Sequence, residues 1–216
     1  MSQTEKLVST SGDVRVAKHQ DIRRMTEILF DGLRGTKFFH IIYPDVDREH
    51  WIDVLADYCA QHVGDPHSIA LVSEDTIGTI TGMVYGRILS DDVPGAKRRP
   101  LDGINQAEQN KMDNSTFKNK LITKYGSILW IEMFAVSSES KGKGYGKALL
   151  NVLLEEAQRR QVNVALSGVE EAVSFYKKFG FVELTPARMI GAGETPGTNQ
   201  MLLDLSTKPG RERSHL

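Results

Sequence analysis

The chain has 216 residues, of which 40% are hydrophobic and 25% are charged, a composition typical of a globular protein that can bury a core. Its 27 lysines and arginines are matched by 28 aspartates and glutamates, and the net charge of -1 argues against a protein that binds nucleic acid. The amino-terminal residues are polar, and no apolar run approaches the ~20 residues that a membrane span needs. We therefore expect a protein that is neither secreted through a signal peptide nor inserted in a membrane.

The single cysteine, Cys59, excludes an intrachain disulfide and favours a reducing, intracellular compartment. Its neighbours predict a helix interior, where a buried structural thiol is more common than a nucleophile. The chain ends in Ser214-His215-Leu216, a variant of the Ser-Lys-Leu peroxisomal address. These features predict a cytoplasmic or peroxisomal location.

Apolar periodicity predicts, in the first part of the chain, a strand, two helices and a hairpin of two strands, at residues 14–17, 21–33, 48–61, 68–73 and 76–88. An aromatic-rich link, residues 36–47, joins the two helices. Residues 91–125 form a long insertion, helical over 104–122, which we expect to be either a lid or a loosely ordered excursion.

The remainder of the chain alternates between strands and helices and ends in two strands, at residues 127–136, 144–160, 162–166, 170–179, 181–184 and 199–205. We expect a single domain over residues 14–205, with a disordered tail at residues 1–13 and a second tail at residues 206–216.

A glycine-rich turn separates the strand at 127–136 from the helix that follows it. Gly142, Gly144 and Gly146 remove three Cβ atoms, so main-chain N–H groups can point at one spot. The amino terminus of the helix adds free amides and the positive end of its dipole. Lysines at positions 141, 143 and 147 place positive charge around the same point. The turn therefore predicts a site for a phosphorylated ligand, and for a diphosphate in particular.

Two common phosphate loops do not match this turn. A Walker A loop needs a glycine at the position of Lys141 and a hydroxyl at the position of Ala148. A dinucleotide fingerprint spaces its glycines as G-x-G-x-x-G, and the next predicted strand, 162–166, lacks the acid that binds ribose. The spacing therefore disfavours both a P-loop NTPase and a Rossmann domain.

A third phosphate loop fits better. Lys141-Gly-Lys-Gly144-Tyr-Gly146 resembles the Q/R-x-x-G-x-G/A loop that holds the coenzyme A pyrophosphate in the GNAT superfamily of N-acetyltransferases, with lysine in the first place. Further along, Ala172-Val-Ser-Phe-Tyr176-Lys-Lys-Phe-Gly180-Phe181 resembles the second signature of that family, A-x-x-x-Y-x-x-x-G-F. Ser167 with Glu170 predicts a capping box for the intervening helix, and Gly180 predicts its carboxyl-terminal cap. Two signatures in the right order identify the chain as similar to the GNAT superfamily.

The resemblance implies the acyl-CoA N-acyltransferase fold, an α/β mixed sheet that is mostly antiparallel and flanked by helices. It implies acetyl-CoA as the co-substrate, with its diphosphate at the glycine-rich turn. In this family the strand before the turn separates from its neighbour, and its main chain, here residues 133–136, binds the pantetheine arm. The residues expected to bind acetyl-CoA are Phe134, Ala135, Val136, Lys141, Gly142, Lys143, Gly144, Tyr145, Gly146 and Lys147.

The same resemblance implies direct transfer of the acetyl group to a primary amine in a ternary complex. The N–H of Phe134 would polarise the acetyl carbonyl. Tyr176 would donate a proton to the departing thiolate, since a phenol stays protonated at neutral pH. Glu132, the only carboxylate of its strand, would act as the base, directly or through water. Alternation along the strand predicts that Glu132 lies on the same side as Trp130 and Phe134.

The aromatic-rich link is where this fold usually builds its acceptor pocket. We therefore expect Phe39, His40 and Tyr43, together with Trp130, to contact the acceptor. A small-molecule amine is favoured because no long acidic or basic groove is evident. The histidines show no spacing typical of a metal site, so we expect no metal.

Two other functions stay open at this point. A GNAT-fold enzyme would use another acyl-CoA or another acceptor, and a catalytically silent member would bind acyl-CoA as a sensor or an assembly module. Release of free thiol in the presence of a panel of amines separates the enzyme from the silent module. Neither the acceptor nor the oligomeric state follows from the sequence.

Overall fold

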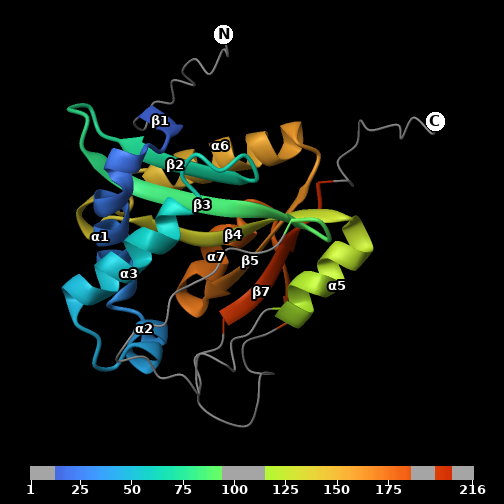
Figure 1. Ribbon diagram of the computed structural model, residues 1–216, viewed down its shortest axis with the longest axis horizontal. Coiled ribbons are helices and arrows are strands. Elements are labelled where there is room, and N and C mark those ends of the chain that lie inside the picture. Colours follow the sequence, from blue (N-terminus) through green and yellow to red (C-terminus); the bar gives the residue numbers. More distant parts are fainter. Residues whose placement is uncertain (1–12, 94–114, 186–197, 206–216) are drawn as a thin grey trace.

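The computed structural model of the chain describes residues 13–93, 115–185 and 198–205 (Figure 1). Several predictions fall partly or wholly outside these ranges. They are the tails expected at 1–13 and 206–216, the lid or loosely ordered excursion expected at 91–125 with the first part of its helix, 104–122, and the targeting signal at 214–216. The described part of the insertion ends in helix α5 (Ser115–Tyr125).

One seven-stranded sheet runs through the described residues, with the strand order β1-β2-β3-β4-β5-β7-β6. Its strands are β1 (Asp13–Val16), β2 (Ser68–Glu74), β3 (Ile80–Ser90), β4 (Ser127–Val136), β5 (Asn163–Val169), β6 (Val182–Thr185) and β7 (Thr198–Leu203). Neighbouring strands are antiparallel except for β4 and β5, which are parallel. The mixed, mostly antiparallel sheet predicted from the sequence is confirmed.

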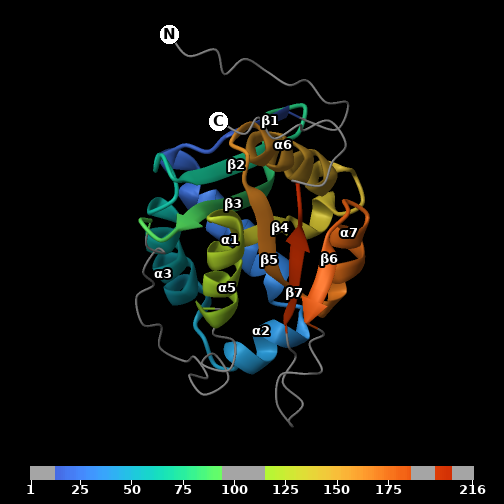
Figure 2. The same cartoon turned by 90° about the vertical axis from the view of Figure 1, so that its right-hand side faces the viewer.

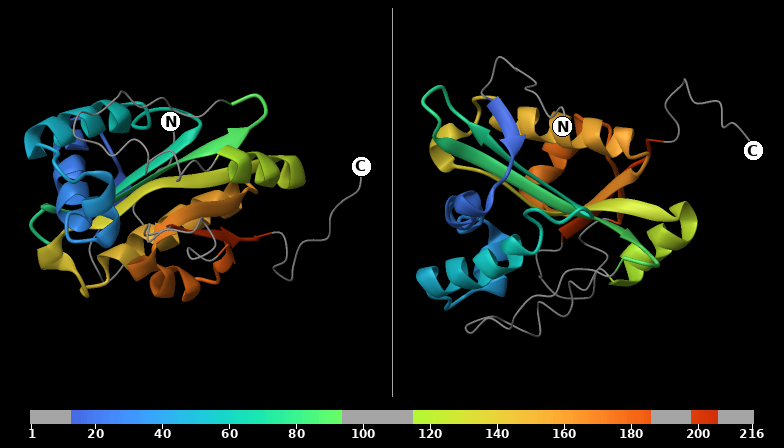
Figure 3. Two further views of the ribbon diagram at one scale, coloured as in Figure 1. Left: turned by 90° about the horizontal axis from the view of Figure 1, so that it is seen from below. Right: turned by 45° about the horizontal axis from the view of Figure 1, so that its top comes forward.

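Helices cover both faces of the sheet (Figures 2 and 3). On one face lie α1 (Ile22–Leu33), α2 (Lys37–Ile42), α3 (Arg48–Ala60) and α5, and on the other lie α6 (Tyr145–Arg159) and α7 (Val173–Lys177). Strand β3 shows the division, because Met83 and Tyr85 pack with α1 and α3 whereas Val84 packs with α6. We refer below to the α1–α3 face and the α6–α7 face.

A β-bulge interrupts the pairing of β3 with β4. Tyr85 pairs with Met133 and Gly86 pairs with Ile131, so Glu132 is an extra residue in β4. The extra residue reverses the alternation: Trp130 packs on the α1–α3 face next to α5, whereas Phe134 packs on the α6–α7 face against Phe175. The prediction that Glu132 shares a side with both Trp130 and Phe134 is therefore wrong, since those two rings lie on opposite faces.

Strands β4 and β5 separate at the same point. Their parallel pairing begins at Ile128 with Asn163 and ends at Ile131 with Leu166. Beyond that pair, β4 continues to Val136 along β3, and β5 continues to Val169 along β7. The sheet therefore opens between residues 132–136 and residues 167–169.

The ends of helix α7 differ from each other in how well the sequence predicts them. Gly180, with φ of 90°, donates its N–H to Lys177 O, and the N–H of Phe181 bonds to Tyr176 O, which is a Schellman motif. The predicted carboxyl-terminal cap is confirmed. The predicted capping box is wrong, because Ser167 lies inside β5, where it pairs with Gln200.

Two shorter elements also differ from the prediction. The turn of the β2–β3 hairpin covers residues 75–79 instead of residues 74 and 75, and the Asp75 side chain accepts the N–H groups of Ile77 and Thr79. The aromatic link contains helix α2, which Thr36 caps by accepting the N–H of Phe39.

Within the described ranges, no helix has the length and apolar character that a membrane crossing requires.

Gly86 lies opposite the bulge, which makes it a direct test of this geometry. A Cβ at Gly86 would lie 2.6 Å from the carbonyl oxygen of Trp130 and 3.2 Å from Cα of Ile131, both main-chain atoms that cannot move independently. We expect Gly86→Ala to lower the free energy of unfolding by about 1–3 kcal/mol. Gly35→Ala is the matched control, because nothing lies within 4 Å of its Cβ position, and it should change stability by less than about 0.5 kcal/mol. Equal urea midpoints for the two variants would contradict the close approach of β3 to the bulge.

Candidate active site

A cavity of about 1070 Å³ lies where β4 and β5 separate. Residues from both faces of the sheet line it, including the glycine-rich turn and α7 on one side and α1, α2 and α3 on the other. A single space thus connects a candidate anion site with an aromatic pocket on the opposite face.

The glycine-rich turn adopts the geometry that its sequence predicts. Gly142 and Gly144 have φ angles of 77° and 92°, which favour glycine because a Cβ clashes there. Gly144 is the N-cap of α6. Within the described residues, no hydrogen-bond acceptor is found for the N–H groups of Gly144, Tyr145 and Gly146. The turn therefore presents free donors at the positive end of a helix dipole, a favourable site for a phosphate.

Gly146 has a different role from the other two glycines. It lies in the first turn of α6, and a Cβ there would be 3.4 Å from Val136 Cγ2 and 3.5 Å from Phe134 Cζ, which are ordinary contacts. Only Gly142 and Gly144 therefore need to be glycine for the main chain to curl.

The lysines of the turn are exposed. Lys141, Lys143 and Lys147 have no carboxylate partner within 4.0 Å among the residues that the structure describes. Lys141 and Lys147 line the cavity, and Lys143 does not. Two mobile cations thus stand beside the free main-chain donors, an arrangement that attracts a diphosphate.

The predicted main-chain segment of β4 also lines the cavity. Phe134, Ala135 and Val136 pair with β3 on one edge, and the described part of the sheet offers them no strand on the other edge. Main-chain groups that point away from β3 are therefore available to hydrogen-bond an extended ligand arm.

Tyr176 is almost fully buried, with 5% of its surface exposed, and it lines the cavity from α7. Its ring lies among those of Phe134, Phe175 and Phe181, with centroids 6.2, 5.4 and 5.6 Å away. Burial raises the pKa of the Tyr176 phenol well above its usual range. The hydroxyl therefore stays protonated throughout the neutral range, so it can donate a proton or a hydrogen bond but cannot act as a base.

Glu132 also lines the cavity, and its side chain is 7% exposed. Oε1 of Glu132 lies 3.4 Å from Nζ of Lys118, which belongs to α5. The same Nζ lies 4.5 Å from the centre of the Trp130 ring. Sequence reasoning missed Lys118, because nothing in the chain indicates that a lysine of the insertion reaches the strand residue at the bulge.

The residues predicted to contact the acceptor divide into two pairs. Tyr43 and Trp130 line the cavity. Phe39 does not; it is a core residue whose ring packs 5.4 Å from that of Phe30 and 5.8 Å from that of Trp51. His40 is exposed and is also absent from the cavity wall. Phe39 and His40 therefore lie outside the cavity wall, since α2 turns one side chain into the core and the other towards solvent.

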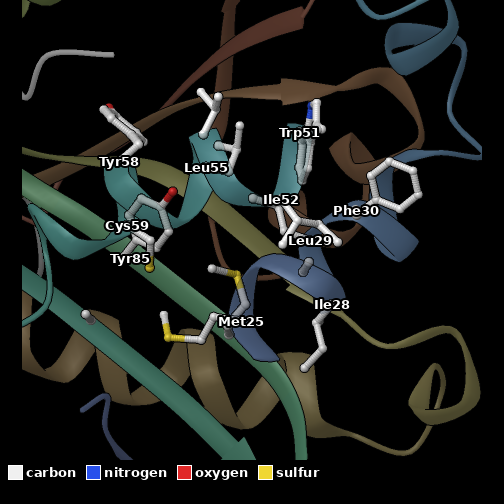
Figure 4. Close-up of a cluster of buried hydrophobic side chains, with 14 of the residues drawn as sticks. Met25, Ile28, Leu29, Phe30, Trp51, Ile52, Leu55, Tyr58, Cys59 and Tyr85 are labelled. Carbon is white, nitrogen blue, oxygen red and sulfur yellow. The ribbon is translucent and has the colours of Figure 1, made fainter. Parts of the chain in front are cut away.

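Helix α3 contributes two aromatic residues that sequence reasoning missed. Trp51, Leu55 and Tyr58 project from the same side of α3, at spacings of four and three residues (Figure 4). Trp51 and Tyr58 line the cavity. The spacing was visible in the sequence, but it marks a buried helix face and does not by itself distinguish a pocket wall from a core.

Cys59 lies outside the cavity wall, on α3, with no exposed surface. Burial raises the pKa of its thiol to about 12.

Across the described ranges, no group of three or more histidine, cysteine, aspartate and glutamate side chains is arranged to hold a metal ion.

Comparison with known proteins places this fold and cavity in one family. The family model for the acetyltransferase (GNAT) family matches residues 29–181. Comparison with curated proteins found no match.

Three solved structures illustrate the similarity in fold. An acetyltransferase from Corynebacterium glutamicum, described as histone acetyltransferase HPA2 and related acetyltransferase, is 18% identical, with 89% of this chain and 95% of that chain covered and a TM-score of 0.57. A putative arylalkylamine N-acetyltransferase 7 from the yellow fever mosquito is 13% identical, with coverage of 88% and 86% and a TM-score of 0.62. A spermidine N-acetyltransferase chimera from Vibrio cholerae and hSSAT is 16% identical, with coverage of 90% and 95% and a TM-score of 0.53. The chain belongs to the GNAT family and is an N-acetyltransferase of that family.

Proposed function

We propose that the enzyme transfers the acetyl group of acetyl-CoA to the primary amine of a small molecule, by direct attack within a ternary complex. The observation that carries this proposal is the two-sided cavity, which joins a free main-chain anion site on one face of the sheet to an aromatic pocket on the other. Two of the similar structures are described as acetyltransferases of spermidine and of arylalkylamines, which supports a small amine as the acceptor.

The glycine-rich turn binds the diphosphate. The main-chain N–H groups of Gly144, Tyr145 and Gly146 donate to its oxygens, and Lys141 and Lys147 neutralise its charge. The unpaired edge of residues 134–136 then holds the pantetheine arm and directs the thioester towards the opening between β4 and β5. A main-chain N–H of this edge, at Phe134, polarises the acetyl carbonyl as negative charge develops on its oxygen.

Glu132 and Tyr176 carry out the proton transfers. Glu132 accepts a proton from the incoming ammonium, directly or through water, and the neutral amine attacks the carbonyl carbon. The C–S bond breaks as the tetrahedral intermediate collapses, and the Tyr176 hydroxyl donates its proton to the departing sulfur. The attacking nitrogen then loses its second proton, which restores the Tyr176 phenol directly or through water. Burial disfavours the thiolate as well as the phenolate, so the raised pKa of Tyr176 does not prevent the transfer. The products are the amide, free coenzyme A and one proton that returns to solvent.

The first prediction from the proposed function tests the anion site with two nearby glycines, Gly144 and Gly146. Gly144→Ala forces a Cβ into a left-handed conformation, at a cost of about 1–2 kcal/mol, and should raise the Kd for acetyl-CoA about tenfold. Gly146→Ala lies inside a helix with ordinary contacts and should bind nearly as well as the parent. Isothermal titration calorimetry with acetyl-CoA measures both. An equal rise of Kd in the two variants would contradict the inference that the left-handed backbone at Gly144 determines the binding of acetyl-CoA.

The second prediction concerns the proton donor. Tyr176→Phe keeps the ring contacts but removes the hydroxyl, so kcat should fall about 100-fold or more while the Kd for acetyl-CoA changes little. Tyr125→Phe, at the end of α5, removes a hydroxyl that lies 3.5 Å from Asp204 and serves as the control. Thiol release, followed by a chromogenic disulfide, gives both rates. An unchanged kcat in Tyr176→Phe would reject the assignment.

The third prediction separates direct transfer from an acetyl-cysteine intermediate. The only cysteine of the chain is buried, and the raised pKa of its thiol leaves almost no thiolate at neutral pH. Cys59→Ala should therefore retain kcat per folded molecule, and the parent should show intersecting lines in initial-rate plots of acetyl-CoA against amine. Parallel lines, or an inactive but folded Cys59→Ala, would contradict direct attack.

A further inference from the structure

The ammonium group of Lys118 lies in the cavity in a way that resembles a bound amine. It is 3.4 Å from a carboxylate oxygen of Glu132 and 4.5 Å from the centre of the Trp130 ring, and all three residues line the cavity. A carboxylate beside an aromatic face is a general binding arrangement for a primary ammonium. Here the chain itself supplies the ammonium.

The proposed function puts the reacting centre near this group. Glu132 is the bulge residue, so its carboxylate projects at the point where β4 and β5 separate and where the two halves of the cavity meet. An acceptor amine must reach this point to attack a thioester held along residues 134–136. Lys118 and the acceptor therefore require the same place.

Apart from Glu132 and Lys118, the described side chains on the α1–α3 wall of the cavity carry no charge. These uncharged side chains are aliphatic and aromatic apart from Thr36, and they include Leu29, Leu33, Phe38, Ile42, Tyr43 and Trp51. Thr36 is occupied, since its hydroxyl donates to Leu33 O and accepts from Phe39 N–H. Among the described residues of this face, Glu132 is the one carboxylate that lines the cavity. The described part of this wall therefore offers no counter-charge to a second ammonium on the acceptor, and burying an ammonium without one is strongly unfavourable.

Resting on the proposed function, we propose that Glu132 and the Trp130 face form the ammonium subsite of the acceptor, that Lys118 fills it in the free enzyme, and that the acceptor is a primary monoamine with an apolar body. The acceptor displaces Lys118, whose side chain is 24% exposed and can extend towards solvent while its stem stays on the wall. Its apolar body then lies against the aromatic wall of α2 and α3.

The substrate class is tested with the unmodified enzyme. Acetyl-CoA binding is first measured by calorimetry, which involves no amine. Thiol release is then compared for phenethylamine, hexylamine, spermidine and a lysine-containing peptide. We expect kcat/KM for the two apolar monoamines to exceed that for spermidine and the peptide about tenfold or more.

The outcomes distinguish this inference from the proposed function. Absence of acetyl-CoA binding would overturn both. Normal acetyl-CoA binding with no turnover of either monoamine, or with spermidine or the peptide preferred, would overturn the substrate class alone.

The role of Lys118 is tested by Lys118→Met, with Lys120→Met as the matched control on the exposed side of the same helix. Methionine keeps the apolar stem and removes the competing ammonium, so the KM for phenethylamine should fall about two- to fivefold while kcat and the KM for acetyl-CoA stay constant. Lys118→Gln, which is polar but uncharged, should act in the same direction. Lys120→Met should change nothing.

A positioning role for Lys118 predicts the opposite result. If Lys118 orients Glu132 during catalysis, then Lys118→Met and Lys118→Gln will lower kcat or raise the KM for the amine. Either change, in folded variants with normal acetyl-CoA binding, would overturn the displacement of Lys118 by the acceptor.

Discussion

The end of pairing between β4 and β5 after Ile131 and Leu166 is the constraint on which the rest of the site depends. A continuous sheet would separate the α1–α3 face from the α6–α7 face with packed side chains and saturated main-chain hydrogen bonds. The separation removes that barrier over a few residues. It leaves one edge of β4 with available donors and acceptors, and it opens a passage between two pockets of different chemistry.

The bulge at Glu132 gives this opening its chemical character. By inserting one residue, it sends Trp130 to the α1–α3 face and Phe134 to the α6–α7 face, so each pocket receives an aromatic ring from the same strand. Glu132 itself lies between these two environments. Gly86 makes the bulge possible from the neighbouring strand, because a side chain there would collide with the carbonyl of Trp130. A residue with no chemical function thus controls the position of a residue proposed to have one.

The sequence predicts best those parts of the site that depend on local backbone chemistry. The curl at Gly142 and Gly144 and the Schellman end at Gly180 require positive φ, and glycine is the usual residue for such positions. The bulge could not be predicted, because strand alternation assumes an uninterrupted ladder, and an extra residue is defined only by its partner strand. The position of Phe39 and His40 outside the cavity wall could not be predicted for a related reason: the link folds into α2, and helical rotation, not closeness in sequence, decides which aromatic residues face the cavity. Lys118 depends on a contact across fourteen residues of chain that no local pattern encodes.

The two-sided cavity also limits how the reaction can proceed. In the proposed reaction the diphosphate is held on the α6–α7 face and the amine enters from the α1–α3 face. The thioester carbon would then be approached from the side opposite the cofactor arm, and no protein group would need to carry the acetyl between them. Cys59, the residue that could otherwise do so, lies on the buried side of α3 and outside the cavity wall. Under this proposal the protein needs only to orient two reactants and to supply proton exchange from Glu132 and Tyr176. Proximity and orientation alone account for a large part of the acceleration of such a reaction, which is consistent with a site whose cofactor contacts come mainly from the main chain.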